Sequence, residues 1–275
     1  MQTAMPTAVQ AAPAPLAQRR LNFRPEWLAT AGAVLALGGI WDLYIRFTGI
    51  SRFLLPSPLD VLTATWTLLG DPWFHGQIGI TVYEVLSGFL LAIVLGGVIG
   101  VALGKSATVE RLCNPLLIAS QVMPKVALMP LFLLWLGFGM GSKIAMVTLL
   151  SIFPIIKNTI LGVRSIERGH RDLFVVIRAG RLRRIVSLEI PAVLPYLMTA
   201  IETASVLAVT GAIVGEYLGG SDGLGAVIVS TMNAMKVDQM FATILVLTVL
   251  GLVFYLSIAA LRARLTAWHS STSEL

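Results

Sequence analysis

Three charged residues, Glu84, Lys125 and Glu202, stand inside long apolar segments of this sequence. A charge at the centre of a bilayer costs about 2.5–3.5 kcal/mol even on the mildest scale, so such residues usually pair or serve an ion pathway. At about 1.5 Å per helical residue, Glu84 and Lys125 are expected at a similar depth, ~10 Å below the outer face. The sequence therefore predicts a buried Glu84–Lys125 ion pair. The alternatives are that Glu202 pairs with Lys125, or that Lys125 extends toward the headgroups.

Residues suited to hydrolysis or metal binding are scarce in these segments. The three histidines, His75, His170 and His269, all lie in predicted loops or tails, and Cys113 is the single cysteine. A buried catalytic or metal centre would need histidines or paired acids at membrane depth. No catalytic residue, metal site or enzymatic activity is therefore expected. Because the sequence has no phosphate-cradling GxxxxGK[ST] motif, no cofactor is expected in this chain, and any ATP and Mg²⁺ would be bound by a separate ATPase chain.

The composition indicates an all-α integral membrane protein. Of the 275 residues, 56% are hydrophobic and only 12% are charged, with a mean hydropathy of +0.84; soluble domains carry about 25% charged residues. The net charge of +6 reflects Lys and Arg in segments expected on the cytoplasmic side, so it does not indicate a nucleic-acid partner.

Apolar runs predict six transmembrane helices, with both chain ends in the cytoplasm. The expected spans are about 27–47, 78–104, 112–138, 144–160, 193–218 and 241–261. Pro124 and Pro130 should kink or break the third span, because proline removes a backbone donor and clashes with the preceding turn. A short helix is expected over 59–69, and a modest amphipathic segment over 224–236.

Four parts follow from this organisation. Residues 1–26 are expected to be a disordered cytoplasmic tail, rich in Ala, Pro and Gln. Residues 27–76 hold the first transmembrane helix and an external segment, and residues 77–264 hold the transmembrane core. Residues 265–275 are a second cytoplasmic tail.

The longest polar interval, 164–191, is a basic loop. Between Arg164 and Glu189 it has seven arginines against three acids, which places it on the cytoplasmic side. Its apolar residues follow helical spacing, which predicts short amphipathic helices. Their apolar faces could be covered by a partner protein, or the loop could rest on anionic lipid headgroups.

Glycines four residues apart mark two of the predicted spans. Gly96 and Gly100 belong to the second span, and Gly211 and Gly215 to the fifth. This spacing keeps small residues on one helix stripe and lets another helix approach closely. These four glycines are therefore predicted helix-packing positions.

Four stretches carry a resemblance to a known family: LLPSP (residues 54–58), TVYEVLSGF (81–89), PKVALMPLFLLWLGFG (124–139) and IVGEYLGGSDGLGAVI (213–228). The chain resembles the permease subunit of bacterial binding-protein-dependent ABC importers, in the branch that serves sulfonates, taurine, nitrate, pyrimidines and riboflavin. The resemblance implies a methionine-importer-like ABC permease fold in the inner membrane and transport of a small polar solute by alternating access. Implied partners are two ATPase subunits, a second permease copy in a homodimer, a periplasmic substrate-binding protein and membrane lipid.

The resemblance also assigns roles to individual residues. A pathway along the dimer axis would be lined by the second, third and fifth spans, with candidates Glu84, Met123, Pro124, Lys125 and Glu202. The rival function, an ion-coupled secondary transporter, would use Glu84, Lys125 or Glu202 as an ion relay.

The family loop that docks on the ATPase usually reads Glu-Ala-Ala, three residues, Gly. Counting back from Pro191 without gaps places Asp172, Leu173 and Phe174 at the first three positions and Arg178 at the glycine. Anchoring on Gly180 requires a two-residue deletion. ATPase coupling is therefore expected at one of these two registers, together with Arg181.

Overall fold

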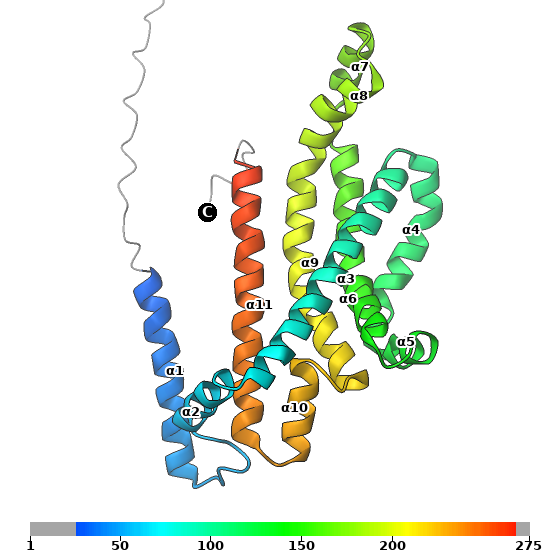
Figure 1. The fold of residues 1–275 in the computed structure, drawn as a ribbon. Coiled ribbons are helices and arrows are strands. Elements are labelled where there is room, and N and C mark those ends of the chain that lie inside the picture. The colour runs from blue at the N-terminus through cyan, green and yellow to red at the C-terminus, as the bar shows by residue number, and fades with distance from the viewer. Residues whose placement is uncertain (1–25, 268–275) are drawn as a thin grey trace, which may run out of the picture. The chain divides into compact units, whose positions relative to one another are not determined.

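The structure, a computed structural model, describes residues 26–267, and every regular element in that range is helical (Figure 1). The tails predicted at 1–26 and 265–275 lie almost entirely outside the described residues. The chain divides into two parts, residues 1–48 and 49–275. The described portion of the first part is helix α1 (Glu26–Thr48), which matches the first predicted span.

The second part begins with a short helix, α2 (Pro58–Leu69), at the position expected for residues 59–69. A capping box fixes its start. The Ser57 Oγ accepts a hydrogen bond of 3.2 Å from the Asp60 N–H, and the Asp60 carboxylate accepts one of 3.1 Å from the Ser57 N–H. These bonds satisfy donors that the first helical turn leaves free, and they hold the pKa of Asp60 below its usual value.

Four helices among the described residues are long and apolar enough to cross a membrane. They are α3 (Pro72–Gly104), α6 (Met140–Arg164), α9 (Ile190–Gly219) with the turns before it, and α11 (Val237–Leu265). A fifth is obtained if a bent pair of helices counts as one span. The remaining predicted span corresponds in position to α1, which is not among these helices, so the described residues give four or five spans and the predicted number of six is not confirmed.

The bent pair is the predicted third span, which breaks as its prolines indicated. Helix α4 (Ala107–Val122) ends just before Pro124, and a 3₁₀ turn (Lys125–Leu128) leads into α5 (Met129–Leu136) at an angle of 88°. Pro130 does not break a helix: it lies in the first turn of α5, where its missing N–H needs no partner.

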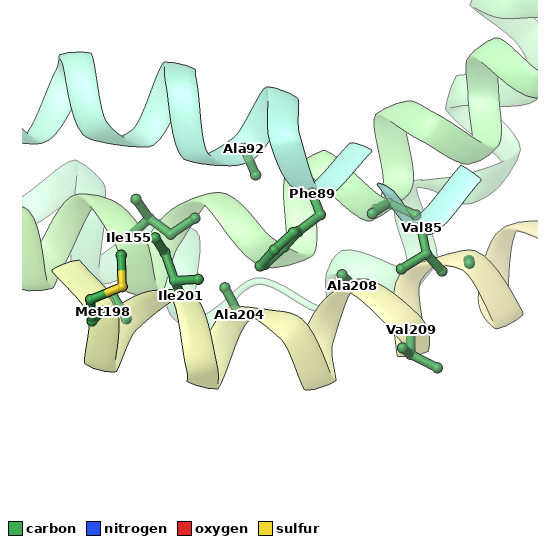
Figure 2. Close-up of a cluster of buried hydrophobic side chains, with 12 residues drawn as sticks. Val85, Phe89, Ala92, Ile155, Met198, Ile201, Ala204, Ala208 and Val209 are labelled. Carbon is green, nitrogen blue, oxygen red and sulfur yellow. The ribbon is translucent and has the colours of Figure 1, made fainter. Parts of the chain in front are cut away.

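Helix α6 lies between α3 and α9 and forms the centre of the fold. Figure 2 shows the main core cluster, where side chains of α3, α6 and α9 meet. Its labelled members include Phe89 and Ala92 from α3, Ile155 from α6, and Ile201 and Ala208 from α9. A second cluster joins α2, α3 and α11 to helix α10 (Leu224–Asn233), which falls inside the predicted amphipathic segment.

The four glycines predicted as packing positions face α6, two from α3 and two from α9. A Cβ placed on Gly100 would lie 2.5 Å from the Cβ of Thr159, and one placed on Gly211 would lie 2.7 Å from the Cα of Val147. Similar approaches occur at Gly96, against Ile155, and at Gly215, against Lys143. The approaches at Gly96, Gly100 and Gly211 are under 3.0 Å and leave no room for a methyl group, whereas the approach at Gly215 is 3.1 Å and is tight.

Candidate functional site

The basic loop folds into two short helices, α7 (Arg168–Val176) and α8 (Arg181–Arg184), followed by one π turn into α9. Figure 1 shows α7 and α8 beyond the ends of the spans, where α6 stops and α9 begins. Val176 and Leu182 are 78% and 75% exposed, and Leu173 is also exposed. The loop therefore presents apolar side chains that this part of the chain does not cover.

The backbone at Arg178 bears on the register of the family loop. Arg178 has φ +49°, in the left-handed region that favours glycine, whereas Gly180 has φ −60°. The Ala179 N–H donates to the Phe174 carbonyl over 3.0 Å, which closes the end of α7 as a glycine-type helix terminus does. Asp172, Leu173 and Phe174 lie on α7, and Arg178 lies at its left-handed end; the choice between the two registers stays a prediction.

Ion pairs attach the inner side of this loop to the spans. The Glu189 carboxylate lies 3.0 Å from Nζ of Lys105, at the end of α3, and 3.3 Å from Nε of Arg184 on α8. The Arg171 guanidinium on α7 donates to the Val163 carbonyl on α6 over 2.9 Å. The loop is thus held on α3 and α6 through charged groups. The exposed side chains of Leu173, Val176 and Leu182 take no part in these contacts.

The predicted Glu84–Lys125 ion pair is wrong, because Glu84 pairs with Lys143. The Lys143 Nζ on α6 lies 3.0 Å from the Glu84 Oε1 on α3. Lys125 Nζ instead lies 5.0 Å from the centre of the Phe153 ring, a cation–π contact. The 88° bend after α4 displaces Lys125 from the straight-helix position that the depth argument assumed.

A buried polar network surrounds this ion pair and reaches the turn between α9 and α10. The Glu216 carboxylate on α9 accepts hydrogen bonds of 2.6 Å from the Thr81 hydroxyl and 2.6 Å from the Gly225 N–H. The Lys143 ammonium donates to the Asp222 carbonyl over 2.8 Å. The turn is therefore fixed to α3 and α6 by side chains that are themselves buried.

Sequence reasoning did not assign Lys143 or Glu216 to a site, although a signal was present. Thr81 and Glu84 belong to TVYEVLSGF, and Glu216 belongs to IVGEYLGGSDGLGAVI, two of the stretches that carry the family resemblance. The structure brings these two stretches together through hydrogen bonds. The polar residues of both stretches thus share one structural role, which is to hold the turn between α9 and α10 on α3.

Two of the predicted pathway residues have charged partners on neighbouring helices. Glu84 is fully buried beside Lys143, and its role in a pathway stays a prediction. Glu202 pairs with α11: its carboxylate lies 2.9 Å from the Arg262 Nε and accepts a hydrogen bond of 2.8 Å from the Tyr255 hydroxyl. It does not pair with Lys125. Met123 and Pro124 are exposed and Lys125 is partly exposed, all at the bend after α4.

Comparison with known proteins gives a consistent picture. Residues 85–267 match the family model described as the binding-protein-dependent transport system inner membrane component. The chain is 36% identical to the formylaminopyrimidine transport permease protein of Halalkalibacterium halodurans, covering 86% of this chain and 93% of that protein. It is 32% identical to the riboflavin transport system permease protein of Chloroflexus aurantiacus, covering 90% and 93%. It is 29% identical to a putative aliphatic sulfonates transport permease protein of Bacillus subtilis, covering 84% of each.

Proposed function

This chain belongs to the family of binding-protein-dependent transport system inner membrane components, and from that premise we propose that its basic loop is the docking surface for an ATPase subunit. The chain is an ABC importer permease, a multi-pass helical protein of the inner membrane. In the proposed assembly two copies of the chain form the pathway and two ATPase subunits bind on the cytoplasmic face. A periplasmic binding protein delivers the solute. The chain itself binds no cofactor, because ATP and Mg²⁺ are held by the ATPase subunits.

The observation that carries the docking proposal is the exposed apolar surface on α7 and α8. Leu173, Val176 and Leu182 are all more than half exposed, and they lie on a segment whose arginines exclude it from the hydrocarbon core. Apolar side chains that lie outside both lipid and protein indicate a protein interface. Because charged groups attach the loop to α3 and α6, movement of a docked ATPase would be passed to the spans.

The solute is a small polar molecule in this proposal. The three relatives are named for formylaminopyrimidine, riboflavin and aliphatic sulfonates, which differ in charge and size. Such variety agrees with selection of the solute by a separate binding protein. The surface candidates for the pathway in this chain are Met123, Pro124 and Lys125, at the bend where helical hydrogen bonding is interrupted. Backbone groups freed at such a bend are suited to line a polar cavity.

Ion-coupled secondary transport is not favoured by any observation on this chain. An ion relay needs acids that exchange protons with a water-filled path. Glu84 is fully buried beside Lys143, and Glu202 is engaged by Arg262 and Tyr255.

The test replaces two apolar side chains of the loop. The double variant Val176→Ser/Leu182→Ser should insert into membranes normally but co-purify about tenfold less of its ATPase subunit, because it removes apolar side-chain area that the docked ATPase would bury. The matched control is Phe53→Ser, which also removes an exposed apolar side chain but lies in a different loop. Unchanged ATPase co-purification and solute uptake in the double variant would place the docking surface elsewhere.

A further inference from the structure

Two adjoining cavities lie behind the basic loop, on the side turned toward the spans. The first, the basic cavity, has a volume of about 490 Å³ and is lined by Lys105, Arg171, Arg181, Arg184 and Glu189, among others. Four basic side chains and one acid give its lining a net charge of +3. Lys105 and Arg184 share the Glu189 carboxylate, whereas Arg181 has no ion pair within residues 26–267. The basic cavity therefore has an unbalanced positive charge.

The second cavity, the apolar groove, has a volume of about 360 Å³ and lies between α3 and α9. Its walls include Gly97 and Val101 from α3, and Ile190, Val193, Leu194 and Leu197 from α9. Lys105, Ile185 and Glu189 line both cavities, so the two cavities are adjacent. From Ile190 to Leu197 the groove follows α9 for about 10 Å, by the rise of a helix.

We propose that an anionic glycerophospholipid binds in this space, with its phosphate in the basic cavity and part of one acyl chain in the apolar groove. A phosphate accepts charge-assisted hydrogen bonds from guanidinium and ammonium groups, which supply the complementary charge. The lipid comes from the leaflet that the arginine excess assigns to the cytoplasm, where anionic headgroups meet basic segments. A free anion would use only the first cavity and leave the second empty.

The wall of the groove contains one buried hydroxyl without a hydrogen-bond partner among the described residues. Thr159 on α6 is 1% exposed and lines the groove, and its Oγ1 has no hydrogen-bond partner within the described part of the chain. A buried helical threonine ordinarily donates to the carbonyl four residues earlier, as Thr148 does to Ile144 over 2.8 Å. A buried hydroxyl without a partner is unfavourable. Because the Thr159 side chain is buried against α3, a lipid ester oxygen would accept its hydrogen bond only after the side chain rotates toward the groove.

The lipid site and the proposed ATPase surface use different sides of the loop. Leu173, Val176 and Leu182 line neither cavity. A lipid in the basic cavity would bridge the loop to α3 and α6 without covering those side chains. It would act as a removable part of the attachment between the loop and the spans.

The test measures binding to the purified full-length chain in neutral detergent, without any ATPase. Short-chain phosphatidylglycerol, phosphatidylcholine of the same chain length, and inorganic phosphate are titrated while thermal unfolding is followed, and bound lipid is identified by native mass spectrometry. Phosphatidylglycerol should raise the Tm and remain bound, and the other two should have little effect. Arg181→Gln should weaken phosphatidylglycerol binding about tenfold, the loss expected for one charge-assisted contact.

The controls use neighbouring residues. Arg183→Gln removes a charge from the same helix at a residue that does not line the basic cavity, so lipid binding should be unchanged. Gly97→Leu adds a side chain where nothing lies within 4 Å of the new Cβ, so it should fill the groove, leave the Tm without lipid unreduced, and abolish the shift.

Several outcomes would overturn the proposal. Equal stabilisation by inorganic phosphate would mean an adventitious ion only. Equal stabilisation by phosphatidylcholine would show that the site does not recognise the anionic headgroup. Equal stabilisation of Gly97→Leu by phosphatidylglycerol would show that no acyl chain occupies the apolar groove. If Gly97→Leu changes the mass of the oligomer without changing lipid binding, the groove is an interface between copies of this chain.

Discussion

The Nζ atom of Lys143 lies 3.0 Å from the Oε1 atom of Glu84, and the two side chains are 4% and 0% exposed. The pair joins α6 to α3. Lys143 also donates a hydrogen bond to the Asp222 carbonyl, which attaches the turn after α9 to the same pair. Burying two charges is costly, and their attraction offsets that cost only while both are present. The stability of the three-helix packing therefore depends on each partner.

Removing the lysine alone should be strongly destabilising. Lys143→Met leaves the Glu84 carboxylate buried without its cation, which costs about 3–5 kcal/mol, and thermal unfolding in detergent should show a large fall in Tm. The double variant Glu84→Gln/Lys143→Met should recover most of the loss, because neither charge remains. Lys125→Met is the control: its ammonium contacts a ring face, so a small change is expected. A larger fall for Lys125→Met than for Lys143→Met would contradict the assigned pair.

Two glycines three residues apart on α3 should respond to alanine in opposite directions. A Cβ on Gly100 would lie 2.5 Å from the Cβ of Thr159, whereas one on Gly97 meets nothing within 4 Å. Gly100→Ala should lower stability by about 1–3 kcal/mol through overpacking. Gly97→Ala should raise it by up to about 1 kcal/mol, because alanine favours the helix. Equal Tm values for the two variants would show that α3 and α6 are not in close contact.

Loss of the Glu216 carboxylate should loosen the turn between α9 and α10. Glu216→Ala removes the acceptor of the Gly225 N–H and of the Thr81 hydroxyl. The hydroxyl keeps the Gln77 carbonyl at 3.3 Å, whereas the buried N–H is left unsatisfied, which costs about 1–3 kcal/mol. Hydrogen exchange followed by mass spectrometry should be faster in the peptide containing residues 220–226. The control is Glu202→Ala, which removes a carboxylate from the same helix. Because the Glu202 carboxylate pairs with Arg262 of α11, this variant should leave hydrogen exchange in that peptide unchanged. No increase in exchange for Glu216→Ala would mean that other contacts fix the turn.

The left-handed backbone of Arg178 should make glycine the better residue there. Arg178→Gly removes the steric cost of φ +49° and should stabilise the end of α7 by about 1 kcal/mol. Arg178→Val should weaken it, since β-branched residues tolerate positive φ poorly. Limited proteolysis of the loop would rank the variants, with cleavage slowest for glycine. Gly180→Ala, at φ −60°, serves as the comparison and should behave like the unmodified chain.

Local patterns predicted much of this fold. Long apolar runs indicated the spans, Pro124 indicated the break after α4, and the helical spacing of the basic loop indicated α7 and α8. Each of these depends on residues close together in the sequence, where proline chemistry and helical periodicity act directly.

The partner of Glu84 depended on distant contacts and could not be found in the same way. Lys143 lies one residue before the predicted span 144–160, yet α6 already begins at Met140. Its burial comes from α3 and from the turn after α9. Lys125 was the wrong choice because depth along the chain was calculated for a straight helix, whereas the segment bends by 88°.

Val147 of α6 is enclosed from two directions: a Cβ on Gly88 would lie 2.5 Å from its Cβ, and one on Gly211 would lie 2.7 Å from its Cα. Sliding α6 by one residue, about 1.5 Å, would bring side chains of other sizes against these glycines. Close packing at these glycines therefore opposes sliding of α6 against α3 and α9. If an ATPase docks on α7 and α8 as proposed, we expect its movement to turn the three helices together, without shear between them.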